Sequence, residues 1–137
     1  MGHATVAVAS SAVFGSPLPA GSLYTRDAFI ETNPHTVQAL ANAMVRALKW
    51  LQTATPEKVA VTVPPEYLVG DRALYLAAFG RNREGYSTDG LFPAAGAEAL
   101  LRVLRVFEPA VREAAGLKIE DTYTNAFARN VPDKYRN

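Results

Sequence analysis

The side chains that could carry out metal or nucleophile chemistry in this chain are few and widely separated. His3 and His35 are the two histidines, and the chain has no cysteine. The two histidines lie too far apart for the ligand spacing of a zinc site. Without cysteine, thiolate metal sites, cysteine nucleophiles and disulfides are all excluded. His35 falls in the first turn of an expected helix, on its polar side, so we interpret it as a solvated surface residue.

The acidic residues and the glycines form no reactive pattern either. Glu120-Asp121 could be an acid/base pair, but charges at the start of a helix, stabilised by its dipole, explain it more simply. Asp89-Gly90 indicates a turn, because the alternating oxygen ligands of a calcium loop are absent. The glycines do not follow a phosphate-binding spacing. The sequence therefore predicts no catalytic residue, no metal site and no cofactor, and we do not expect an enzyme.

Length and composition limit the kind of protein. A chain of 137 residues with 49% hydrophobic residues is long enough for one compact domain. Charged residues make up 20%, the net charge is +1, and no block of one sign occurs, so no nucleic-acid partner is expected. No apolar run reaches the roughly 18 residues of a membrane-spanning helix. The first ten residues make a poor secretory signal, because no Lys or Arg precedes their short apolar run.

The element that organises the chain is a long helix expected over residues 34–51. Asn33 is a preferred N-cap residue, and Pro34 falls at the first helical position, where a missing N–H costs nothing. Apolar residues then recur every three or four positions: Val37, Leu40, Ala41, Met44, Val45, Leu48 and Leu51. This spacing predicts one buried face, opposite a polar face with Gln38, Asn42, Arg46 and Lys49.

The remaining elements are short. Leu23-Tyr24-Thr25 is the best candidate strand, and residues 4–9 alternate weakly as a second one. Residues 59–63 alternate like a strand, but Thr55-Pro56 before them is a helix start. We favour a short helix ended by Pro64 and Pro65, which leave no room for a longer strand. Further helices are expected over 65–68, 71–80, 93–107 and 120–128, with Gly116 as a left-handed stop. The resulting class is mainly α with one or two short β-strands.

Several of these segments resemble one stretch of a known family. The resemblance rests on AFIETNPHTVQAL over residues 28–40, continuing to ALKWL over 47–51, with VFGSPLP at 13–19 and Leu23-Tyr24-Thr25 upstream. Downstream it rests on TPEK at 55–58, YSTDG at 86–90 and YTNAF at 123–127. In this order they resemble the C-terminal part of periplasmic substrate-binding proteins of ABC importers, in the nitrate/sulfonate/taurine/bicarbonate group related to thiamine-pyrimidine-binding proteins.

The resemblance implies a fold, a function and a location. Residues 11–137 would be the C-terminal portion of an α/β two-lobed (type II) periplasmic-binding-protein fold, and residues 1–10 a tail or short strand that fits a vector-derived leader. The longer protein would capture a small anion or organic solute, such as nitrate, a sulfonate or taurine, and deliver it to the permease subunits in the periplasm. Phe14, Ser16 and Tyr24 would contact the solute, because the family's ligands are enclosed near this segment.

Other interpretations stay open. The chain could be a stand-alone helical interaction module, or a fragment of a thiamine-pyrimidine synthesis enzyme, although such enzymes use cysteine and this chain has none. A lone strand at residues 23–25 would leave backbone groups unpaired, at about 1 to 3 kcal/mol for each buried one. We therefore expect pairing with a second copy of the chain or with a complementing N-terminal fragment. The identity of the solute is not encoded in these residues.

Overall fold

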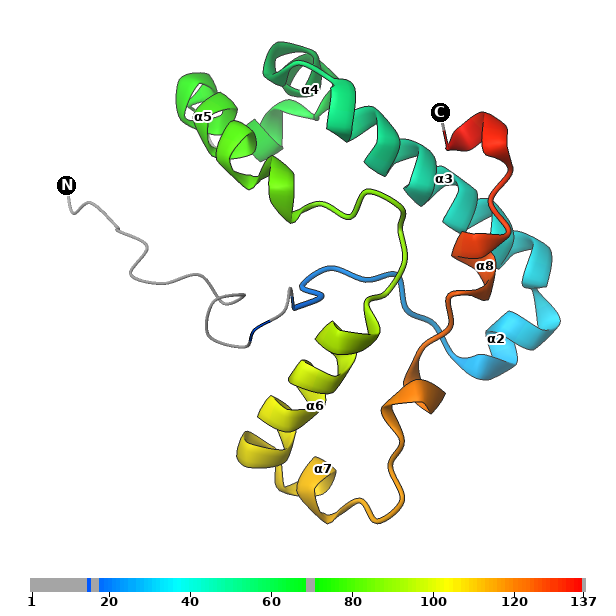
Figure 1. The fold of residues 1–137 in the computed structure, drawn as a ribbon. Coiled ribbons are helices and arrows are strands. Elements are labelled where there is room, and N and C mark those ends of the chain that lie inside the picture. Colours follow the sequence, from blue (N-terminus) through cyan, green and yellow to red (C-terminus); the bar gives the residue numbers. More distant parts are fainter. Residues whose placement is uncertain (1–14, 16–17, 69–70, 137) are drawn as a thin grey trace. The chain divides into compact units, whose positions relative to one another are not determined.

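All regular structure in the described part of the chain is helical (Figure 1). The computed structural model describes residues 15, 18–68 and 71–136. The α-helices are α2 (Asp27–Thr32), α3 (Pro34–Thr53), α4 (Pro56–Thr62), α5 (Arg72–Asn82), α6 (Ala94–Phe107), α7 (Pro109–Glu113) and α8 (Ala126–Arg129). Four 3-10 turns accompany them: η1 (Pro65–Leu68), η2 (Arg83–Gly85), η3 (Ile119–Thr122) and η4 (Asp133–Tyr135). Contacts divide the chain into two compact units, one of residues 27–91 with 126–137 and one of residues 1–26 with 92–125.

The predicted fold class is wrong, because the described residues form an all-helical structure and not a mixed α/β portion of a type II binding-protein fold. The strand expected at Leu23-Tyr24-Thr25 is irregular chain. Leu23 is 54% exposed and Tyr24 91% exposed. Water can therefore solvate this backbone, and the penalty for buried unpaired groups does not arise. The strand expected at residues 4–9 lies outside the described residues.

Helix α3 begins where the sequence predicts but is not capped as predicted. Pro34 occupies the first turn, and Val37 and Val45 are buried, as expected for the apolar face. The Asn33 side chain makes no capping hydrogen bond to the helix. Its Nδ2 instead donates to Thr32 Oγ1 at 2.8 Å. Because the connection from α2 to α3 is short, the Asn33 side chain is directed toward Thr32. Pro34 therefore fixes the start of α3 without a side-chain cap.

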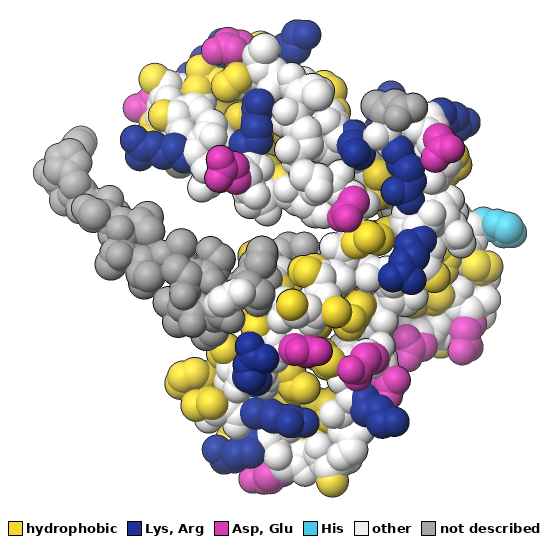
Figure 2. Space-filling model, viewed as in Figure 1, with side chains coloured by type: hydrophobic (Ala, Val, Ile, Leu, Met, Phe, Trp, Pro, Cys, Tyr) yellow, Lys and Arg dark blue, Asp and Glu magenta, His cyan; other side chains and the backbone are white. Residues whose placement is uncertain are grey.

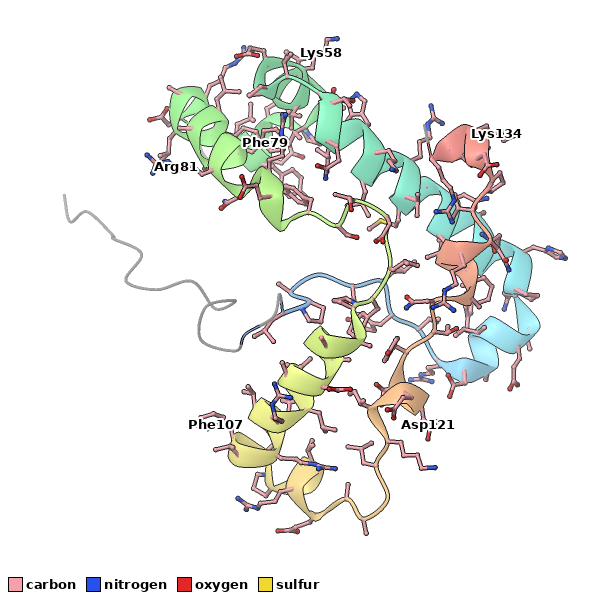
Figure 3. The ribbon with its side chains drawn as sticks, in the orientation of Figure 1. Lys58, Phe79, Arg81, Phe107, Asp121 and Lys134 are labelled. Atoms are coloured by element: carbon pink, nitrogen blue, oxygen red, sulfur yellow. The ribbon has the colours of Figure 1, made fainter. Side chains whose placement is uncertain are left out.

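Helices α4 and α5 build the core of their unit. The conflict over residues 56–63 is resolved as a helix, with Thr55 Oγ1 accepting from Lys58 N at 3.3 Å. Asp71 caps α5 as predicted, its Oδ1 accepting from Leu74 N at 2.9 Å. Phe79 of α5 packs with Ala54 and Val59. Figure 3 shows Phe79 directed toward α4, whereas Arg81 and Lys58 point outward.

The unit that contains α6 buries small residues. Pro93 precedes the helix, as predicted, and the buried positions of α6 are Gly96, Ala97 and Ala99. Phe107, at the end of α6, is 75% exposed and points away from the helix (Figure 3). Gly116 has a φ of +83°, the left-handed stop that the sequence predicts. Figure 2 shows charges of both signs scattered among hydrophobic side chains over α6 and α7.

Candidate functional site

The structure does not gather the predicted solute-contacting residues into a site. Phe14 and Ser16 lie outside the described residues. Tyr24 is 91% exposed, and no described residue gives it a hydrogen bond or a ring contact. Gly15, between the two undescribed positions, has a φ of +71°. Of the predicted residues, the described structure therefore offers Tyr24 alone, on an irregular exposed segment.

A different set of side chains converges on the polar face of α3, where the C-terminal segment lies (Figure 1). Gln38 Nε2 donates to the Phe127 carbonyl at 2.9 Å and to Asn42 Oδ1 at 2.9 Å. These bonds attach α8 to the first half of α3. The C-terminal segment therefore covers part of the polar face of α3, which the sequence predicts to be exposed to solvent.

Arg136 fixes the conformation of that C-terminal segment. Its Nε donates to the Val131 carbonyl at 2.9 Å. Its Nη2 donates to the carbonyls of Ala128 and Arg129 at 2.6 and 3.0 Å. The last carbonyls of a short helix are common acceptors for arginine, because they carry the negative end of the helix dipole. The guanidinium is therefore held at the end of α8.

A tight loop brings residues 86–90 against the second half of α3. Gly90 N donates to Ser87 Oγ at 2.9 Å, and Leu91 N donates to Asp89 Oδ1 at 2.9 Å. Gly90 has a φ of +76°, and a Cβ placed there would lie 2.8 Å from Val45 Cγ2. Only glycine adopts this positive φ readily and also leaves room for Val45 Cγ2. This close approach holds the loop, including Thr88, beside α3.

Helix α3, the 86–90 loop and the C-terminal segment line an open surface cavity of about 640 Å³, which we call the α3 hollow. Its lining residues are Arg46, Lys49, Trp50, Gln52, Thr53, Thr88 and Arg136. Five of them come from α3, one from the loop and one from the C-terminal segment. A smaller cavity of about 210 Å³ shares Arg46 and is otherwise lined by Ala39, Asn42, Ala43 and Tyr135.

The α3 hollow is positively charged. Arg46, Lys49 and Arg136 are three cations, and no described residue of the lining carries a carboxylate. Trp50 is 38% exposed and contributes an apolar ring. Cations and hydrogen-bond donors around an aromatic surface bind anions, whereas acid/base catalysis needs a paired acid and base. The geometry is therefore suited to anion binding.

Part of this site could be read from the sequence. Arg46 and Lys49 have helical spacing on the predicted polar face, and that expectation is correct. Arg136 and Thr88 join them only through the hydrogen bonds of the C-terminal segment and the close approach at Gly90. No local signal in the sequence places either residue beside α3.

The described residues hold neither a metal-binding cluster nor a helix that could span a membrane. They contain no group of three or more His, Asp or Glu side chains that could hold a metal ion. Among the described helices, none combines the length and apolar character needed to span a bilayer.

Comparison with known proteins gives one informative similarity. No family model matches the chain, and no curated protein matches it. A solved protein of Bordetella bronchiseptica RB50 is similar, with 44% identity and a TM-score of 0.86. The similarity covers 93% of this chain but 40% of the Bordetella chain. The helical arrangement therefore recurs within a considerably longer polypeptide.

Proposed function

We propose that this chain is a segment of a solute-binding protein of an ABC importer. In this proposal the complete protein captures a small anion or organic solute in the periplasm and delivers it to the permease subunits. The sequence resemblance over residues 28–51 and the shorter matching stretches motivate the assignment. The helical fold of the segment is then one part of a larger receptor.

The observation that carries the proposal is the similarity to a longer chain. Almost the whole segment, 93%, matches 40% of the Bordetella protein at 44% identity. A segment embedded in a longer protein is what the resemblance implies.

The test uses the protein encoded by the whole reading frame. We expect calorimetry to detect binding of nitrate, taurine or an alkanesulfonate. Tyr24→Ala should weaken binding about fivefold, because in this proposal its hydroxyl donates a hydrogen bond to the solute, and such a bond is worth about 1 kcal/mol. Tyr67→Ala is the matched control, since Tyr67 is a 65% exposed tyrosine outside the predicted site. A reading frame confined to these 137 residues, together with no solute binding, would contradict the proposal.

A stand-alone interaction module is the second candidate, and one observation favours it. Leu40 and Met44 of α3 lie one turn apart, 44% and 48% exposed, and so offer an apolar surface. In that case sedimentation of this chain should show a concentration-dependent dimer. Met44→Glu should abolish the dimer, whereas Val61→Glu, at a 72% exposed position of α4, should not. A monomer at all concentrations would exclude the dimeric module.

A further inference from the structure

We propose that the α3 hollow is a binding site for a small organic oxyanion, whose charged group lies among Arg46, Lys49 and Arg136 and whose apolar part lies on Trp50. Its lining shares no residue with the solute contacts expected at Phe14, Ser16 and Tyr24. It uses residues from α3, from the 86–90 loop and from the C-terminal segment. The inference does not depend on the importer assignment.

The first argument is the imbalance of charge. Three like charges around one cavity repel each other, and no carboxylate of the described lining offsets them. Asp89, next to Thr88 in sequence, is the acidic residue of the adjoining loop. Its Oδ1 accepts from Leu91 N at 2.9 Å and from Ser87 Oγ at 3.1 Å. That carboxylate is engaged within its own loop, and Arg136 already donates to three carbonyls. Arg46 and Lys49 are therefore the two cations for which a bound anion would supply the counter-charge.

The second argument is that the segments forming the site are fixed. Three hydrogen bonds to carbonyls hold the Arg136 guanidinium. The bond from Gln38 to the Phe127 carbonyl attaches the C-terminal segment to α3. Gln52 Nε2 donates to the Tyr86 carbonyl at 3.4 Å and so links the other side of the hollow to the loop. These bonds fix the backbone segments that carry the lining, so those segments lose little conformational entropy when a ligand binds.

The third argument concerns the type of ligand. Arg46 and Lys49 present several N–H donors, which suit carboxylate and phosphate oxygens. Thr53 Oγ1 already donates to the Trp50 carbonyl at 3.3 Å, so its hydroxyl proton is engaged. The exposed part of the Trp50 ring offers apolar contact. A cavity of about 640 Å³ accommodates a small molecule.

A long polyanion is less suited to this surface. The chain carries a net charge of +1, with 14 basic and 13 acidic side chains distributed along it. Nucleic-acid binding proteins present a continuous basic stripe along the backbone of their ligand. The hollow is one local group of three cations. We therefore infer a ligand with one or two charges rather than a polymer.

Trp50 supplies the experiment, because it is the single tryptophan of the chain. Its fluorescence is measured while this protein is titrated with butyl phosphate, butyrate, inorganic phosphate and butylammonium. We expect a saturable change with butyl phosphate and butyrate. Inorganic phosphate should bind more weakly because it lacks an apolar part, and butylammonium should give no change. Affinity should fall as salt is added, because the charges are near the surface.

Variants test whether the hollow is responsible. Arg46→Gln and Lys49→Gln should each weaken butyl phosphate binding about threefold, the usual scale for a partly exposed ion pair. Arg81→Gln is the matched control, because Arg81 is an exposed cation of α5 in the same unit and outside the lining. Calorimetry on the same variants removes any dependence on the fluorescence signal, and circular dichroism verifies that they are folded.

Two results would overturn the proposal. One is the absence of a saturable signal with every anion in both fluorescence and calorimetry. The other is an equal loss of affinity in Arg81→Gln and in the two hollow variants. Neither result bears on the importer assignment, because that assignment is tested by solute binding to the longer protein and its Tyr24→Ala variant.

Discussion

The two units of the chain stabilise their helices in different ways. The unit around α3 buries large side chains, among them Val45, Val59 and Phe79. The described buried positions of α6 are Gly96, Ala97 and Ala99, while Val106 and Phe107 at its end are 64% and 75% exposed. Burial of large apolar side chains contributes most of the free energy of folding. The comparison indicates that the α3 unit has a core of large side chains, whereas the described buried positions of α6 are small residues.

Polar contacts differ between the units as well. In the α3 unit, Arg83 donates to the Ala54 carbonyl at the end of α3, and its guanidinium lies 5.0 Å from the Phe79 ring centre. In the α6 unit, the Asn125 side chain accepts from Phe92 N at 2.8 Å and donates to Phe92 O at 3.0 Å. The Phe92 and Tyr123 rings stack with centres 4.8 Å apart. Asn125 thus clamps the backbone of Phe92 in the α6 unit, whereas Arg83 of the α3 unit joins the end of α3 to the Phe79 ring.

The largest expected effect is at the core of the α3 unit. Phe79 is 6% exposed and packs with Ala54 and Val59. Phe79→Ala should lower the free energy of unfolding by about 3 kcal/mol, because it leaves a cavity. Phe107→Ala, the matched change in the α6 unit, should stay within about 0.5 kcal/mol. Urea denaturation measures the free energy of unfolding of both variants. Equal losses of stability would refute the contrast between the units.

A smaller effect is expected where the 86–90 loop meets α3. Gly90→Ala should lower the free energy of unfolding by about 2 kcal/mol, through strain at a positive φ and a clash with Val45. Gly80→Ala should have the opposite sign and add about 0.5 kcal/mol, because it lies in α5 with open space around its Cα. Thermal denaturation of the two variants gives the comparison. A neutral Gly90→Ala would show that the loop is not held in this position.

The smallest expected effect lies in the α6 unit. Asn125→Ala should lower its stability by about 1 kcal/mol, because the N–H and carbonyl of Phe92 lose their partner. Asn125→Asp should fall between the wild type and Ala, since it keeps the acceptor for Phe92 N and loses the donor to Phe92 O. Hydrogen exchange at the Phe92 amide reports the change locally. Unaltered protection in Asn125→Ala would argue against the clamp.

The sequence predicted well those features that depend on neighbouring residues. Pro34, Pro56 and Asp71 mark helix starts, and Gly116 a left-handed stop, because caps and backbone preferences act within three or four residues. The helix at 56–62 was predicted, despite its alternating valines, from the family resemblance and from Pro64 and Pro65, which leave no room for a longer strand. The long helix followed from spacing alone. Of its predicted buried face, Val37 and Val45 are buried, whereas Leu40 and Met44 are 44% and 48% exposed.

The sequence predictions were wrong where the preference of a residue type takes effect only through a neighbouring group. The strand at residues 23–25 was predicted from residue type, but a strand needs a neighbour, and the exposed chain there has none among the described residues. Asn33 is a good N-cap by type, yet its amide donates to Thr32. Both outcomes depend on what lies around the residue.

By itself, the amino-acid order determined most of the helices, several of their starts and the polar face of α3, whereas the helix expected over 120–128 is divided into η3 and α8. Tertiary structure alone decided that Arg136 and Thr88 complete the α3 hollow, and that Gly90 must lack a side chain. The reason is the separation along the sequence over which each effect acts. Helix propensity and capping are settled within a few residues, whereas a cavity is formed by segments that meet only after the chain has packed.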